Sequence, residues 1–99
     1  MTATKRPRSP EASDEDLMAR IQADDLGAFE ELFDRYSAQA FGLARAMCRG
    51  SSGGAEEALQ DGFLAIWLSR SSFDPARGSV RAWLFAVIRH RALDQLRRS

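Results

Sequence analysis

Several residue types and patterns are rare or absent in this sequence, and each absence excludes a class of protein. A single cysteine, Cys48, excludes an internal disulfide framework and is typical of a reducing cytoplasm. No apolar run approaches the roughly 20 residues that a membrane-spanning helix needs, and residues 1–8 lack the apolar stretch of a secretory signal. We therefore expect a cytoplasmic protein without membrane insertion, in which Cys48 is a buried structural thiol.

Patterns that support catalysis or metal binding are scarce as well. One histidine and one cysteine are too few for a typical zinc site. The pair Gly53-Gly54 follows no predicted strand and lacks the lysine of a phosphate-binding loop. The adjacent acids Glu56 and Glu57 point in different directions on a helix, so they do not form an acid–base pair in one cleft. We predict that the protein is not an enzyme and has no catalytic residue, metal site or cofactor.

The charges balance to zero overall but are unevenly distributed along the chain. Residues 1–10 carry three basic groups and no acidic one, and residues 11–61 carry twelve acidic and four basic groups. Residues 62–99 carry two acidic groups and seven basic ones, all of them arginines. An acidic body with a basic end suits a protein that binds an anion at one end and a cationic partner at the other. Chance asymmetry in a short helical protein is the alternative at this point.

The apolar spacing predicts helices throughout one domain, residues 13–99, after a disordered tail, residues 1–12. Ser13 followed by three acids is a helix-start signal, and Asp24 and Asp25 end this first helix and can cap the next. The second helix has apolar residues in steps of three and four: Phe29, Leu32, Phe33, Tyr36, Ala40, Leu43 and Met47. Residues 50–54 break it. No segment has strand alternation, so we predict an all-α bundle of three or four helices.

The third predicted helix, residues 55–68, has two apolar faces. One is a core face, formed by Ala55, Leu59, Gly62, Phe63 and Ile66. On the opposite side two leucines lie among acids, where a free surface would be polar. We interpret that side as a partner-binding strip, with a solvated acidic face as the alternative. The strip consists of Glu57, Gln60, Asp61, Leu64 and Leu68.

A loop over residues 69–78 leads to a fourth helix that Ser79 can cap and that extends to about residue 98. Its first half, residues 80–88, is apolar nearly all round. Either this helix is central in the bundle, or its additional apolar surface contacts another molecule. Its second half is rich in arginine. Cations near a helix C-terminus favour the helix dipole, but seven arginines within 38 residues exceed that requirement.

Three stretches together resemble region 2 of the extracytoplasmic-function (ECF) group of the sigma-70 family. They are FEELFDRYSAQAFGLARAM (29–47), AEEALQDGFLAIW (55–67) and FDPARGSVRAWLFAVIRHRALDQLRR (73–98). The third is the most specific, because Trp83-Leu84, Asp94 and the final arginine pair occur at the family's spacing. The chain departs from the family at Ile88, where a small residue is usual, and at His90, where asparagine is usual. The preferred promoter base therefore does not follow from the family pattern.

The resemblance implies two working surfaces. The strip on the third helix would bind the clamp of the β′ subunit of core RNA polymerase. The loop and the fourth helix would bind the non-template single strand of the promoter −10 element, capturing extruded bases. Phe73, Phe85 and His90 are the candidates for base contacts, while Trp83 and Leu84 are assigned to the core. The candidates for phosphate contacts are Arg77, Arg81, Arg89, Arg91, Arg97 and Arg98.

The resemblance also implies an anti-sigma factor that covers these surfaces. The chain ends before the family's −35-reading region, which we interpret as an excised domain, with a natural single-domain protein as the alternative. Two other functions remain open from the residues. A helix-turn-helix regulator would share the basic last helix but prefer duplex DNA, and a helical protein-interaction module would be indifferent to DNA.

Overall fold

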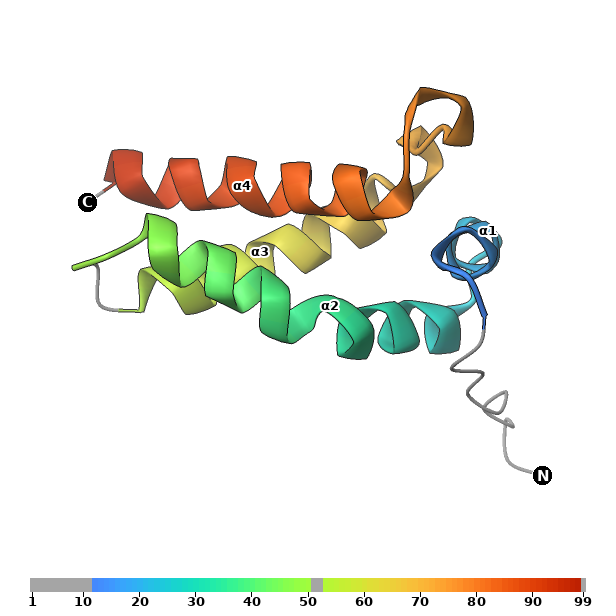
Figure 1. Cartoon of the computed structure of the whole chain (residues 1–99), viewed down its shortest axis with the longest axis horizontal. Coiled ribbons are helices and arrows are strands. Elements are labelled where there is room, and N and C mark those ends of the chain that lie inside the picture. The colour runs from blue at the N-terminus through green and yellow to red at the C-terminus, as the bar shows by residue number, and fades with distance from the viewer. Residues whose placement is uncertain (1–11, 51–52, 99) are drawn as a thin grey trace.

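The computed structural model describes residues 12–50 and 53–98, which form helices and no strand (Figure 1). The all-α prediction is therefore confirmed. Four α-helices are present among these residues, and the connection between the last two contains two short 3₁₀ helices. The predicted tail lies outside the described residues except for Ala12. The elements are α1 (Asp14–Gln22), α2 (Leu26–Met47), α3 (Gly54–Leu68), η1 (Arg70–Ser72), η2 (Pro75–Arg77) and α4 (Val80–Arg98).

The helices begin where side-chain caps were predicted. The hydroxyl of Ser13 accepts a hydrogen bond from the Asp16 amide at 3.0 Å. A carboxylate oxygen of Asp25 accepts one from the Ala28 amide at 3.1 Å, which caps α2. Ser79 accepts one from the Ala82 amide at 3.1 Å at the start of α4. Each cap satisfies a backbone N–H that has no partner within its helix.

The helices share one core, and α4 is central in it. This helix packs against α1, α2 and α3, and Val80, Leu84 and Ile88 in its first half are fully buried. Trp83 and Val87 are only partly buried. The helix is therefore central in the bundle, and it also keeps apolar surface that its neighbours do not cover. The helices α3 and α4 pack closely at Gly62, where an added Cβ would lie 2.4 Å from Cδ1 of Ile88. Side chains fully buried in this core are Leu17, Met18, Ile21, Leu32, Ile66, Val80, Leu84 and Ile88.

The burial expected from the apolar pattern differs from the observed burial mainly at the edges of the helix contacts. Cys48 is buried as predicted, and it lies in a smaller cluster with Ala44, Ala58 and Ala92. Phe33 belongs to the apolar pattern of the second predicted helix, but it is 37% exposed and contacts Phe63 in an edge arrangement of the two rings. It lies at the rim of the α2–α3 contact, where helical spacing cannot distinguish a half-covered position from a buried one.

A polar cluster attaches the start of α1 to α2. The guanidinium of Arg35 donates to the carboxylate of Asp14 at 3.0 Å and to the carbonyl of Ala12 at 2.8 Å. It also pairs with Glu31 at 3.4 Å, one helical turn earlier. The hydroxyl of Tyr36 donates to the other oxygen of Asp14. These bonds hold α1 against the bundle beside its buried apolar residues.

Candidate nucleic-acid and partner interfaces

The strip predicted on α3 is exposed in the structure. Leu64 is 56% exposed and Leu68 is 70% exposed, the two largest values among the exposed large apolar side chains of the described residues. Glu57 and Gln60 are also exposed, and Asp61 is half-buried. Apolar side chains at this exposure, next to acids, leave a surface that a partner with apolar and basic groups can cover.

The loop between α3 and α4 encloses a hollow of about 380 Å³. Asp74 initiates η2 by accepting a hydrogen bond from the Ala76 amide at 3.0 Å. Gly78 then adopts φ 150°, a conformation that L side chains rarely adopt, and this turns the chain into α4. The hollow is lined by Ser72, Phe73, Asp74, Arg77, Gly78, Ser79, Ala82 and Trp83.

Phe73, which was predicted to contact a DNA base, is buried in this structure. Phe73 is only 7% exposed and belongs to the core. Its ring packs against that of Trp83, with centroids 5.5 Å apart and planes at 60°. An aromatic residue in a predicted loop is expected to be exposed, but this loop folds back onto α4 and turns the ring of Phe73 inward. Trp83, assigned to the core from the sequence, is partly buried and also lines the hollow.

The structure does not bring the three predicted base-contact residues together. Phe85 faces α2, where it packs edge-on against Tyr36 with centroids 5.8 Å apart. His90 is exposed and faces α3, where it lines a shallow groove of about 360 Å³. The groove is lined by Ala65, Ser69, Val87, His90, Arg91 and Asp94. Because Trp83, Val87 and His90 follow one another at helical spacing, the loop hollow and this groove share one side of α4.

The predicted phosphate-contacting arginines are all exposed, but three of them have partners within the chain. Arg81 lies 5.0 Å from the ring centroid of Phe85 and 5.7 Å from that of Tyr36. It also donates a hydrogen bond to Gln39 at 3.1 Å. Arg91 and Arg97 approach Asp94 only at 3.8 and 3.9 Å. The basic end of α4 therefore presents several guanidinium groups that a phosphate chain could reach.

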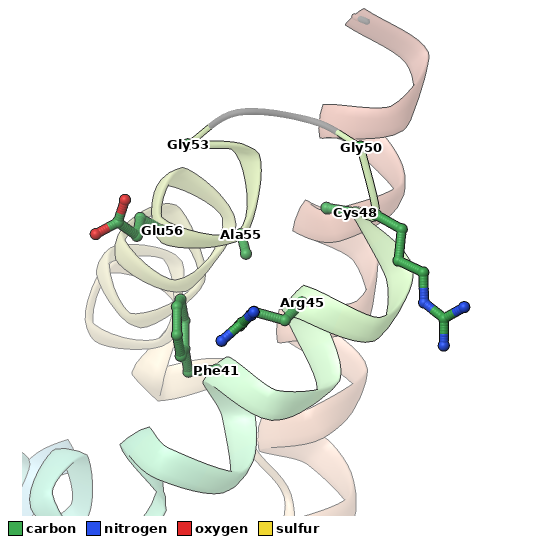
Figure 2. Close-up of a pocket in the computed structure, with 8 residues that line it drawn as sticks. Phe41, Arg45, Cys48, Gly50, Gly53, Ala55 and Glu56 are labelled. Atoms are coloured by element: carbon green, nitrogen blue, oxygen red, sulfur yellow. The ribbon is translucent and has the colours of Figure 1, made fainter.

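A third hollow, of about 350 Å³, lies where α2 and α3 meet and coincides with neither predicted surface. Figure 2 shows Arg45 extending from α2 toward the ring of Phe41, while Glu56 projects from α3 away from it. Arg45 lies 5.8 Å from the ring centroid of Phe41. The described part of the chain has no group of three or more His, Cys, Asp or Glu residues that could hold a metal ion. None of its helices has the length and apolar character to cross a membrane.

Sequence reasoning missed Arg70, which organises the start of the loop. Its guanidinium lies 4.1 Å from the ring centroid of Trp67 and donates to the carbonyl of Trp67 at 2.7 Å. It also donates to Asp24 at 2.6 Å. No local signal marks these contacts, because Asp24 lies 46 residues away in the sequence.

Comparison with known proteins identifies the family. A family model described as Sigma-70 region 2 matches residues 32–99. The chain is 37% identical over 81 residues to the ECF RNA polymerase sigma factor SigK of Mycobacterium bovis (strain BCG / Pasteur 1173P2), an alignment that covers 82% of this chain and 43% of the relative. It is 38% identical over 100 residues to the protein of that name in Mycobacterium sp. (strain KMS), which covers 98% and 51%.

These relatives confirm the resemblance to the ECF group that the sequence motifs indicated. The chain spans about half the length of the curated relatives it matches. No solved structure matches it. From the match over residues 32–99 and the four-helix fold, the chain belongs to the sigma-70 region 2 family.

Proposed function

We propose that this chain is the domain of a bacterial ECF sigma factor that binds core RNA polymerase and recognises the promoter −10 element during transcription initiation, in the cytoplasm and without catalysis. The main observation behind this proposal is that two surfaces of different chemical character lie on different elements. The acid-edged leucines are on α3, and the loop hollow and arginines are on the loop and α4. Two such surfaces suit a protein that binds polymerase and DNA at the same time.

On the polymerase side, we propose that the α3 strip binds the clamp of the β′ subunit. Leu64 and Leu68 would lose their exposed apolar surface, and the surrounding acids would meet basic groups of the clamp. Because both leucines are more than half exposed, their truncation should change stability by no more than about 0.5 kcal/mol.

On the DNA side, we propose that the loop hollow and the His90 groove receive bases extruded from the non-template strand. A partly exposed aromatic wall at Trp83 and hydrogen-bonding groups at Asp74 and Ser79 give the hollow the mixed lining that base recognition requires. His90 offers a second polar contact along the same side of α4. Phe73 would support the hollow from beneath, and Phe85 would hold Arg81 in place.

An anti-sigma factor that covers these surfaces is a further part of this proposal. The exposed leucines of α3 would then be shared between polymerase and inhibitor, so that binding of the two would be mutually exclusive. The groups that give polymerase affinity would also give the inhibitor its affinity.

The polymerase surface is tested by measuring the affinity of the chain for core RNA polymerase. We expect the double variant Leu64→Ser, Leu68→Ser to bind at least tenfold more weakly, a loss of about 1.4 kcal/mol. Leu96→Ser is the matched control, because Leu96 is 40% exposed but lies on α4. Equal binding by the double variant and the wild type would refute the assignment of this surface.

The DNA surface is tested by fluorescence anisotropy with labelled single-stranded −10 sequences and duplex controls, at two salt concentrations and with core polymerase bound. We expect salt-sensitive, sequence-selective single-strand binding that His90→Ala alters. A preference for duplex DNA would instead support a helix-turn-helix regulator. Indifference to DNA together with failure to bind polymerase would support an interaction module.

A further inference from the structure

The first helix contacts both ends of the loop that forms the hollow. The side-chain amide of Gln22 donates hydrogen bonds to the carbonyls of Arg70 and Phe73, each at 3.0 Å. At the other end of the loop, the carboxylate of Glu15 accepts one from the Val80 amide at 3.4 Å. Figure 1 shows α1 nearly end-on, beside the base of this loop. Both N–H groups of the Gln22 amide are thus used to fix the loop backbone.

The turn after α1 provides a second contact with the loop, from a residue whose backbone conformation is unfavourable. Asp24 has φ 69°, the only positive φ of a non-glycine residue among those described. The amide of Asp24 bonds to Ile21 and that of Asp25 to Arg20, which is the Schellman ending that usually has glycine at the left-handed position. Aspartate there is less favourable for the backbone. Its carboxylate, however, binds the guanidinium of Arg70 at the start of the loop.

We propose that Gln22 and Asp24 are positioning residues for the recognition loop: they hold residues 70–73 so that the hollow exists before a base arrives. The proposal rests on the function proposed above. A pre-formed loop lowers the conformational entropy lost on binding, so the contacts of α1 add to DNA affinity without touching DNA. Both residues lie outside residues 32–99, which match the family model.

A purely structural role for the two residues gives a different expectation. If Asp24 only ended α1, Asp24→Gly would relieve the left-handed backbone and would leave the loop unchanged. If Asp24 positions the loop, the same substitution should keep or raise the unfolding midpoint while it loosens the loop. Gln22→Met retains side-chain length and removes only the amide.

The test combines hydrogen exchange with DNA binding for the double variant Gln22→Met, Asp24→Gly. We expect the amides of Ser72, Phe73 and Arg77 to exchange at least fivefold faster, without a lower unfolding midpoint. With core polymerase bound, affinity for the −10 single strand should fall roughly two- to tenfold for each lost hydrogen bond. Polymerase affinity should stay the same. Ala38→Met, at an exposed position of α2 outside both proposed surfaces, is the control for the exchange and DNA measurements.

Unchanged exchange in the loop of the double variant would overturn the proposal, as would faster exchange with unchanged DNA affinity. If the wild type selects no single strand, base capture fails as a function, and the exchange data still decide whether α1 positions the loop. Faster loop exchange with weaker −10 binding and an unchanged unfolding midpoint supports the proposal.

Discussion

Gly62 of α3 packs directly against Ile88 of α4, and alanine there should destabilise the protein. Its added methyl would meet Cδ1 of Ile88 at 2.4 Å, and overpacking of this kind costs about 1–3 kcal/mol. The gain in helix propensity, about 1 kcal/mol, offsets only part of that cost. Chemical denaturation should therefore show a net loss for Gly62→Ala.

Two companion variants identify the cause of that loss. Gly42→Ala lies in α2 with nothing within 4 Å of the new methyl, so it should gain about 0.5–1 kcal/mol. Ile88→Val removes the atom that clashes, so the double variant should lose less than the sum of the two single variants. Additive losses would show that the two side chains do not compete for one space.

Tyr36 should make stability depend on pH in the alkaline range. Burial raises the pKa of its hydroxyl above 10.0, and the hydrogen bond to Asp14 and its negative charge raise the pKa further, against the lowering effect of Arg81. A raised pKa in the fold means that the neutral phenol is favoured. Its contribution is complete below pH 10, the ordinary value, and is lost as the pH rises through the folded value.

Tyrosinate absorbance can follow this titration directly, because Tyr36 is the only tyrosine of the chain. The native protein should titrate at higher pH than the unfolded chain. Tyr36→Phe should lose about 0.5–1.5 kcal/mol at neutral pH with the hydrogen bond to Asp14. Above pH 10 its unfolding free energy should fall less steeply than that of the wild type. Parallel curves for the two proteins would contradict the assignment.

At the scale of elements, α1 should be indispensable to the fold although the family match begins after it. Leu17, Met18 and Ile21 are fully buried, and each contributes about 1.5–3 kcal/mol relative to exposure. Their sum is comparable with the whole stability of a typical domain, about 5–15 kcal/mol. A chain that starts at Asp25, and so retains the cap of α2, should lack cooperative thermal unfolding.

Leu17→Ala is the reference for the truncated chain, because it removes only one of the three buried side chains. It should lower the free energy of unfolding by about 2–5 kcal/mol. Circular dichroism should find native helix content in this variant at room temperature and reduced content in the truncated chain. A truncated chain with a sharp thermal transition would show that α2, α3 and α4 form a sufficient core by themselves.

The elements were predictable from the sequence where local rules determine them, and the contacts between distant segments were not. Ser13, Asp25 and Ser79 cap helices because capping depends on residues three positions apart. The exposed leucines of α3 follow from helical spacing in the same way. The bond from Gln22 to the loop joins segments 51 residues apart, which periodicity does not encode. The inward ring of Phe73 depends on how the loop packs on Trp83 of α4, which helical spacing does not encode either.

At the scale of the whole molecule, the net charge of zero conceals two regions of opposite sign. Most acids lie in the first three helices, where α3 presents its exposed leucines, and the arginines gather on the loop and α4. On the function proposed above, opposite signs on the two surfaces would orient the domain between a basic partner and a nucleic acid, and they would disfavour DNA on the α3 side.

Salt dependence measures how many arginines contribute to DNA binding. Each phosphate neutralised on a single strand adds about −0.7 to the slope of log K against log salt concentration. Arg97 and Arg98 are exposed at the end of α4, so their joint replacement by alanine should reduce the slope by about 1.4. Arg81→Ala should reduce it by less, because that guanidinium already packs on Phe85 and bonds to Gln39. Equal reductions per arginine would mean that Arg81 leaves these partners for a phosphate.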